Sequence, residues 1–272
     1  MTDRYAVVGN PIAHSKSPLI HSMFARQTRQ DMRYDAMLAP LDGFKTTADT
    51  FRQLGGKGMN VTVPFKLEAH QLATGLTERA GIAQAVNTLK FEDGQILGDN
   101  TDGAGLVQDI IGNLNMPITG KHILLMGAGG AARGVILPLL QQKPAMLAIA
   151  NRTPQKAVAL QKQFIQHGQT DAGDYAHFAG KRFDIIINAT AASLNDALPA
   201  LPPGIFAADA LAYDMMYSAE PTRFLKYAEK QGVHHLADGI GMLVEQAAES
   251  FHLWRGIRPE TKDIIAQLKN PG

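Results

Sequence analysis

Cysteine is absent from the 272 residues of this sequence. The chain therefore has no disulfide framework, no thiolate metal site and no cysteine nucleophile. An excess of either charge is also absent, because 26 Lys and Arg residues stand against 25 Asp and Glu residues, for a net charge of +1. The basic residues are scattered, so the sequence has no positive field that would attract nucleic acid.

Long apolar runs are missing as well. No stretch approaches the ~20 residues that a membrane-spanning helix needs, and residues 1–5 show no signal-peptide pattern. The apolar fraction is ordinary for a globular chain, and the length allows one large domain or two modest ones. We expect a soluble, cytoplasmic protein without metal, nucleic-acid or membrane partners.

The segment KHILLMGAGGAARG, at 121–134, carries the pattern around which the chain is organised. Residues 123–126 are typical of a buried parallel strand, and periodic apolar residues from Val135 onward predict a helix. The small residues between them are Gly127, Ala128, Gly129, Gly130 and Ala131. In a dinucleotide-binding unit, such residues permit a tight turn and let backbone N–H groups meet the pyrophosphate. A plain turn is the alternative, but the flanking strand and helix favour the nucleotide site.

The next predicted strand, at 145–150, indicates which dinucleotide would bind. A site for NAD usually has an acidic residue at the end of this strand, but the segment that follows here is NRTP, at 151–154. An arginine attracts a 2′-phosphate through charge-assisted hydrogen bonds, so Arg152 favours NADP. Lesser contacts are expected from Asn151, Thr153 and Lys156. The alternative is that the segment only caps a helix from near Pro154, with Thr153 as the N-cap.

The remaining patterns alternate between strand and helix. Strands are predicted at 5–9, 33–38, 59–63, 86–92, 95–98, 183–188 and 207–211, and the main helices at 18–27, 42–54, 104–114, 221–231 and 239–254, with glycine turn 55–58. This alternation predicts an α/β protein of two domains with a cleft between them. An N-terminal α/β substrate domain is expected at 1–102, with the helices of 239–272 packing back on it. A C-terminal Rossmann-type NADP-binding domain is expected at 103–238.

Two positions at the carboxyl ends of predicted strands could touch a ligand. Ser15 and Ser17 follow the strand at 5–9, and paired hydroxyls can hold a polyol or a carboxylate; the alternative is capping, with Ser17 as an N-cap before Pro18. Lys66 follows the strand at 59–63, where open α/β sheets place ligand groups. A solvated lysine is the alternative, but a cation at a helix N-terminus is unfavourable and calls for a nearby acid.

Two further candidates lie on predicted helices. Asp102 comes near the N-terminus of the helix at 104–114, where the helix dipole stabilises a carboxylate, and a plain capping role is the alternative. Gln246 shares one face of the last helix with Gly239 and Met242, beside its apolar stripe. An amide so placed should have a hydrogen-bond partner, unless it is exposed.

Several motifs together resemble those of the shikimate dehydrogenase family, in the family's order over nearly the whole chain. They are NPIAHSKSP at 10–18, NVTVPFK at 60–66, AVNT at 85–88, GDNTDG at 98–103, GAGGA at 127–131, NRT at 151–153, NAT at 188–190 and GIGMLVEQ at 239–246. The glycine run is shared with many dehydrogenases, whereas the lysine and NTD segments are much more specific. The resemblance implies reversible oxidation of shikimate to 3-dehydroshikimate with NADP, in aromatic amino acid (chorismate) biosynthesis.

The resemblance also implies roles for individual residues. Ser15 and Ser17 would hold the substrate carboxylate. The residues implied around the substrate hydroxyls are Thr62, Lys66, Asn87, Asp102, Tyr217 and Gln246, and those implied near the cofactor are Glu78, Met215 and Gly239. Lys66 and Asp102 would be the catalytic pair that handles the hydroxyl proton. Two such groups titrate as a unit, and which of them carries the proton at a given pH stays open.

The chain departs from the family's usual run at two places. Gln84 stands where a glycine commonly precedes the AVNT motif, and Ala191-Ala192 replaces a Ser-Gly-type continuation near the nicotinamide end of the expected cleft. An enzyme that also uses quinate, or NAD, is one alternative, and a non-catalytic NADP-binding sensor is another. A sensor would not need Lys66 together with Asp102. The oligomeric state, monomer or homodimer, stays open.

Overall fold

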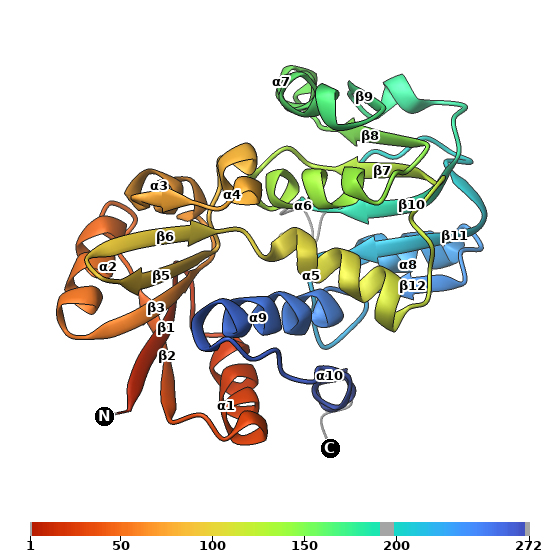
Figure 1. The fold of residues 1–272 in the computed structure, drawn as a ribbon. Coiled ribbons are helices and arrows are strands. Elements are labelled where there is room, and N and C mark those ends of the chain that lie inside the picture. Colours follow the sequence, from red (N-terminus) through yellow and green to blue (C-terminus); the bar gives the residue numbers. More distant parts are fainter. Residues whose placement is uncertain (1, 191–198, 270–272) are drawn as a thin grey trace. The chain divides into compact units, whose positions relative to one another are not determined.

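The computed structural model describes residues 2–190 and 199–269. The chain divides into two compact units. Unit 1 comprises Met1–Leu106 with Leu243–Gly272, and unit 2 comprises Val107–Met242. Each unit contains a six-stranded sheet within the described residues, so the expected α/β class with two domains is confirmed (Figure 1).

Unit 1 has a mixed sheet in the order β2-β1-β3-β5-β6-β4. Its strands are β1 (Asp3–Gly9), β2 (Met32–Leu38), β3 (Gly56–Val61), β4 (Gly75–Leu76), β5 (Thr88–Glu92) and β6 (Gln95–Asp99). Its helices are α1 (Ser17–Thr28), α2 (Phe44–Gln53), α3 (Lys66–Leu72), α4 (Glu78–Ala83) and α10 (Lys262–Lys269). The first three strands of this order are parallel, whereas β5 and β6 form an antiparallel hairpin around Asp93-Gly94, a typical hairpin-turn pair.

Unit 2 has an entirely parallel sheet in the order β12-β11-β10-β7-β8-β9. Its strands are β7 (His122–Met126), β8 (Met146–Ala150), β9 (Thr170–Gly173), β10 (Phe183–Asn188), β11 (Phe206–Asp214) and β12 (His235–Ala237), and its helices are α6 (Gly130–Gln141), α7 (Pro154–Phe164) and α8 (Arg223–Lys230). This is the doubly wound order: successive strands are added on one side of β7 as far as β9, and then on its other side from β10 to β12. The switch point lies between β7 and β10. Ligands of such sheets bind outside the carboxyl ends of the strands at that point.

The apolar runs of unit 2 are explained by burial on both faces of its sheet. Leu124 and Met126 lie in one core cluster with Phe224 and Leu225 of α8. The residues that alternate with them, such as Ile123 and Leu125, point to the opposite face and are also fully buried. A strand covered on both sides reads as a continuous apolar run rather than as an alternating one.

Two helices run across the boundary between the units in sequence. They are α5 (Asp102–Gln108) and α9 (Ile240–Arg255). The helix predicted at 104–114 therefore begins earlier, at Asp102, and ends earlier, at Gln108. A π-helical turn, Asp109–Asn113, follows it. The change of geometry coincides with buried Asp109, whose carboxylate accepts hydrogen bonds from Asn113 (2.9 Å) and the Tyr213 hydroxyl (2.6 Å).

The predicted turn at 55–58 is only partly correct. Gly55 is left-handed, with φ of +87°, but β3 begins at Gly56. The next glycines make room for aromatic rings of the same unit. A Cβ on Gly56 would lie 2.2 Å from the Phe51 ring, and one on Gly58 would lie 2.4 Å from Nε1 of Trp254. The glycine cluster therefore reflects packing against a strand rather than a long turn.

Of the two predicted helix caps, Ser17 is wrong and Thr153 is confirmed as the N-cap residue. Ser17 is the first residue of α1 rather than its N-cap, and its backbone N–H donates to the Ser15 hydroxyl at 3.3 Å. Thr153 is the N-cap of α7, but its side chain makes no capping hydrogen bond. Its backbone carbonyl instead accepts from the Asn151 amide (2.9 Å) and the Lys156 N–H (3.0 Å). At α1 the hydroxyl contact comes from Ser15 instead of Ser17, and at α7 contacts to the Thr153 carbonyl replace a hydroxyl cap.

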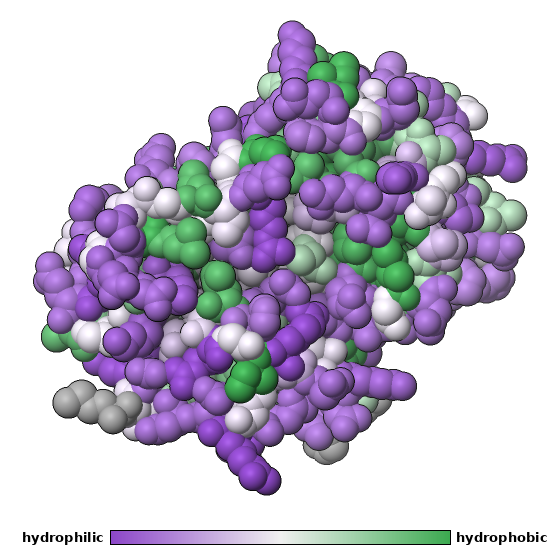
Figure 2. All heavy atoms as spheres, viewed as in Figure 1, coloured by the Kyte–Doolittle hydropathy of each residue, from purple (hydrophilic) through white to green (hydrophobic). Residues whose placement is uncertain are grey.

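Several large apolar side chains are exposed, such as Leu38, Leu41 and Leu54. Figure 2 shows that the viewed face is mainly hydrophilic, with apolar residues in separate small groups. Such scattered apolar side chains are normal on a folded surface. In the described part of the chain, no helix combines the length and the apolar character needed to cross a membrane.

Candidate active site

Lys66 and Asp102 form an ion pair in unit 1. Lys66 is the first residue of α3, and its Nζ lies 2.5 Å from Oδ2 of Asp102, the first residue of α5. Both side chains are largely shielded from water, with exposed fractions of 15% and 7%. The acid that a lysine at a helix N-terminus requires is therefore Asp102. An amine and a carboxylate in a sheltered place can move a proton to or from a bound hydroxyl.

The Asn87 side chain fixes the other oxygen of Asp102. The backbone N–H of Thr101 can only donate, and it donates to Oδ1 of Asn87 at 2.8 Å. The amide nitrogen of Asn87 must then point the other way, and it donates to Oδ1 of Asp102 at 2.7 Å. This contact leaves Oδ2 of Asp102 for Lys66. The orientation of the Asn87 amide therefore follows from the backbone and needs no assumption about its flip state.

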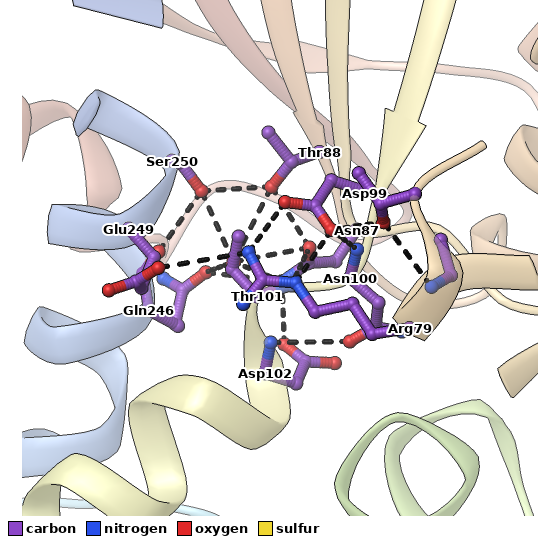
Figure 3. Close-up of polar contacts among 12 residues, drawn as sticks. Arg79, Asn87, Thr88, Asp99, Asn100, Thr101, Asp102, Gln246, Glu249 and Ser250 are labelled. Atoms are coloured by element: carbon purple, nitrogen blue, oxygen red, sulfur yellow. Dashed lines mark hydrogen bonds and ion pairs between the residues drawn. The ribbon is translucent and has the colours of Figure 1, made fainter. Parts of the chain in front are cut away.

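Gln246 has the partners that its position required. Its Nε2 donates to the carbonyl of Leu243 (2.8 Å), and its Oε1 accepts from Asn87 (3.3 Å) and Thr101 (3.4 Å). Figure 3 shows this glutamine on α9 beside the Asn87 and Asp102 side chains. The amide is therefore linked to the lysine–aspartate pair through Asn87, and Gln246 is not an exposed residue.

A buried polar network behind this site was missed by the sequence analysis. Ser250 is fully buried on α9, and its hydroxyl accepts from the Asn60 amide (2.9 Å) and contacts the hydroxyls of Thr88 (2.8 Å) and Thr101 (3.2 Å). Thr88 also donates to Oδ1 of Asn87 at 2.9 Å. One signal was available, because Ser250 lies four residues after Gln246 and so on the same helix face.

Three other candidate residues lie at the carboxyl ends of neighbouring parallel strands. Ser15 and buried Ser17 follow β1, and partly buried Thr62 follows β3. The two strand ends are in contact, because a Cβ on Gly9 would lie 2.4 Å from Cγ2 of Thr62. The N–H of Thr62 donates to the carbonyl of Val8 at 2.9 Å. Lys66 and Asp102 follow β3 and β6, so these hydroxyls belong to the same edge of the unit 1 sheet.

The glycine turn of unit 2 has the backbone geometry of a phosphate site. Gly127 follows β7 with φ of +114°, and a Cβ there would lie 3.0 Å from the carbonyl oxygen of Ala189, which follows β10. Gly129 precedes α6 and has open space where a Cβ would be. The turn, with Ala128, Gly130 and Ala131, lies at the carboxyl end of the two strands where the sheet order reverses. It fits a dinucleotide pyrophosphate in backbone shape and in position.

The residues after β8 fit a phosphorylated ribose. Arg152, Thr153 and Lys156 are exposed, and Asn151 is partly exposed. Among the described residues, no carboxylate forms an ion pair with the Arg152 guanidinium. Positive charge without an acidic partner at this strand end suits a 2′-phosphate rather than a free 2′-hydroxyl.

The remaining candidates are divided between the two units. Met215 and Tyr217 follow β11 in unit 2, and Gly239 lies in the same unit. Gly239 must be glycine, because a Cβ would lie 2.2 Å from the carbonyl oxygen of Met215. Glu78, by contrast, is an exposed residue at the start of α4 in unit 1.

The two departures from the family's pattern have different outcomes. Gln84 has φ of +52°, a left-handed conformation that glycine adopts most easily. This conformation explains why glycine suits the position. Ala191-Ala192 lies outside the described residues.

Two hollows lie elsewhere. One of about 330 Å³ in unit 2 is lined by residues such as His122, Lys181 and Phe183 at the amino ends of strands. One of about 630 Å³ in unit 1 is lined by residues such as Asp3 and Gly56, also at strand amino ends. Neither lining includes a candidate residue. Within the described ranges, no group of three or more His, Asp or Glu side chains is placed to hold a metal ion.

The strand order, the glycine turn and the sheltered lysine–aspartate pair define the class, a two-domain α/β oxidoreductase that uses a dinucleotide. A protein of Nitrosomonas eutropha named shikimate dehydrogenase (NADP(+)) is 63% identical over 269 residues, which cover 98% of this chain and 97% of the relative. The chain therefore belongs to the shikimate dehydrogenase family, and NADP is its cofactor. A protein of the same name from Herminiimonas arsenicoxydans is 60% identical, with 99% and 98% covered.

Family models and solved structures agree with this membership. The models described as shikimate dehydrogenase substrate binding domain, shikimate/quinate 5-dehydrogenase and shikimate 5′-dehydrogenase C-terminal domain match residues 7–89, 106–195 and 239–269. An Ael1 enzyme from Pseudomonas putida superposes with a TM-score of 0.92 at 50% identity, covering 99% of both chains. The Thermus thermophilus shikimate 5-dehydrogenase in complex with NADP(H) and shikimate superposes with a TM-score of 0.86 at 29% identity, covering 97% of both chains.

Proposed function

We propose that Lys66 and Asp102 handle the hydroxyl proton while this chain interconverts shikimate and 3-dehydroshikimate with NADP. The chain is an NADP-dependent oxidoreductase acting on a CH–OH group. The observation that carries the proton-handling role is the 2.5 Å contact between Lys66 Nζ and Asp102 Oδ2 in a sheltered position. Lysine and aspartate at this distance from each other can exchange a proton with one substrate hydroxyl.

The geometry around the pair supports a binding role for the neighbouring groups. Lys66 donates one N–H to Asp102, so its other N–H groups can donate to a substrate hydroxyl. The Asn87 and Gln246 amides flank the pair and can orient adjacent hydroxyls of a cyclic polyol. Thr62 would contribute at the end of β3, while Ser15 and Ser17 would hold the substrate carboxylate at the end of β1. Tyr217 would complete this set from unit 2.

The proton and the hydride follow separate routes in this proposal. In the oxidation, the lysine–aspartate pair would accept the hydroxyl proton. NADP supplies the hydride acceptor when bound, and the protein orients the alcohol and moves the proton. The contacts proposed for NADP come from the glycine turn at 127–131, from Asn151, Arg152, Thr153 and Lys156, and from Glu78, Met215 and Gly239.

The proposal assigns the substrate contacts other than Tyr217 to unit 1 and the NADP contacts other than Glu78 to unit 2. It also includes the finer expectations from the sequence, namely a cytoplasmic location, a monomer or homodimer, and no nucleic-acid partner. A non-catalytic NADP-binding protein would not require the buried arrangement of Lys66, Asp102 and Asn87, so that arrangement favours catalysis.

The test is the rate of NADP reduction by the Lys66→Ala variant with shikimate. We expect kcat to fall by about 10²–10⁴-fold, the usual contribution of general acid–base catalysis. Lys90→Ala is the matched control, because Lys90 is a partly buried lysine of the same unit, paired with Glu92 at 2.7 Å. Near-normal turnover of Lys66→Ala would refute the assigned role.

A further inference from the structure

An ion pair next to the site has no role in the proposed chemistry. Arg79 lies in the first turn of α4, and Asp99 is the last residue of β6. The Arg79 guanidinium donates from Nε to Oδ1 of Asp99 at 2.7 Å and from Nη2 to Oδ2 at 2.6 Å. The Asp99 side chain is only 2% exposed. Two parallel charge-assisted hydrogen bonds fix the carboxylate in angle as well as in position.

The hydrogen bonds of Asp99 lead to Asp102 by a side-chain route. Oδ1 of Asp99 also accepts from the N–H of Asn100 at 2.7 Å. Asn100 is fully buried, and its Oδ1 accepts from the N–H of Asp102 at 3.2 Å while its Nδ2 donates to the carbonyl of Ala85 at 2.9 Å. Figure 3 shows Arg79, Asp99, Asn100 and Asp102 along this path.

A second route uses the backbone of Asp99. Its carbonyl accepts from the N–H of Asn87 at 3.0 Å, and the Asn87 amide holds Oδ1 of Asp102. Asp99 is therefore connected to Asp102 by hydrogen bonds through Asn100 and also through Asn87. The carboxylate of Asp99 in turn is held by Arg79, with Thr77 donating from its hydroxyl at 2.6 Å.

We propose that Arg79 and Asp99 are positioning residues for the reaction, because their ion pair holds the 99–102 segment so that Asp102 meets Lys66. A shielded ion pair contributes little net stability compared with apolar packing, but it defines one geometry. A misplacement of about 1 Å at a catalytic group can cost about 100-fold in rate. This inference rests on the proposed function of Lys66 and Asp102.

Two conservative variants test the inference in the full chain. Asp99→Asn keeps the size and one acceptor oxygen but removes the charge. Arg79→Lys keeps the charge but removes the planar guanidinium that makes two parallel hydrogen bonds to Asp99. We expect each to lower kcat for shikimate oxidation by about 10–100-fold, with the KM for shikimate changed by less than about threefold. Arg255→Lys is the matched control, because Arg255 contacts Asp3 and Gln30 in the same unit and none of the residues between Asp99 and Asp102. It should keep kcat.

A double-mutant cycle separates positioning from general destabilisation. If Arg79 acts through the Lys66–Asp102 pair, Arg79→Lys should cost little further rate in a Lys66→Ala background. Additive losses in that background, or wild-type kcat in both Arg79→Lys and Asp99→Asn, would overturn the inference. A wild-type chain that does not oxidise shikimate with NADP would overturn the proposed function and the inference together, whereas an active wild-type chain with unaffected variants would overturn only the inference.

Discussion

His21 is a fully buried residue of α1 whose two ring nitrogens have no hydrogen-bond partner among the described residues. Its ring stacks on that of Tyr34, with centroids 4.1 Å apart and an interplanar angle of 8°. Burial lowers the pKa of His21 from 6.5 to about 3, against a smaller opposing effect of the nearby Asn60 amide. The ring is therefore neutral in the folded protein and works there as an aromatic core residue.

This histidine should make the fold sensitive to acid. Between pH 6.5 and about 3, the unfolded chain binds a proton at His21 that the folded chain does not, so the free energy of unfolding falls as the pH falls through this window. His21→Phe should reduce the slope of that free energy by about 1.4 kcal/mol per pH unit. Urea unfolding at several pH values measures it, and exposed His252→Phe is the control. An unchanged slope would contradict the buried neutral ring.

Arg152 allows a test of cofactor preference at a single residue. Arg152→Ala should weaken NADP by about 10–100-fold, the value of a charge-assisted hydrogen bond, and should leave NAD almost unaffected because NAD has no 2′-phosphate. Lys162→Ala, further along α7, is a control for loss of charge. Dissociation constants for both dinucleotides measure the effect. If the preference stays the same, the 2′-phosphate is held elsewhere.

Single residues also show where sequence patterns stop being informative. The position of Lys66 at a helix start indicated that an acid was needed, but the acid is 36 residues away, and only the resemblance identified it. Arg79 gave no local signal that it lies near the site, and the one signal for Ser250 was its position four residues after Gln246 on the same helix face. Their roles depend on contacts between segments that come together only in the fold.

At the scale of elements, the strongly periodic segments were predicted well. The strand–turn–helix at β7 and α6 and the two strands β5 and β6 are confirmed, because turn residues and burial pattern are local properties. The short strands β4, β9 and β12 were missed, since two to four residues carry no periodicity. The π-helical turn after α5 was also missed, and its first residue, Asp109, accepts a hydrogen bond from the distant Tyr213.

The glycine turn after β7 permits a test at this scale. Gly127→Ala would place a Cβ 3.0 Å from the Ala189 carbonyl in a left-handed conformation, at a cost of about 1–2 kcal/mol. The turn should shift, and we expect the NADP dissociation constant to rise at least about tenfold. Gly120→Ala is the matched control, because Gly120 also has positive φ (+73°) but has no atom within 4 Å of its Cβ position. Equal NADP affinity in both variants would show that the turn does not need this geometry.

At the scale of the whole molecule, unit 1 is assembled from both ends of the chain. The C-terminal segment Leu243–Gly272 joins Met1–Leu106. On α9, Trp254 donates to the carbonyl of Leu89 at 3.0 Å, and Gln246 reaches Asn87. The packing of the last helices against the N-terminal domain was predicted from their apolar face. The residues that they contact could not be derived from periodicity.

This division predicts that each ligand protects its own unit against hydrogen exchange. Ligand binding slows the local opening of the segments that it contacts. Shikimate alone should protect the amides of residues 85–102 and 243–250, and NADP alone should protect those of 127–134 and 151–156. Peptides from α2 and α8, one in each unit and without a candidate residue, are the controls. Protection by NADP confined to residues 1–106 would reverse the assignment of the two units, because the pyrophosphate would then not lie at the turn after β7.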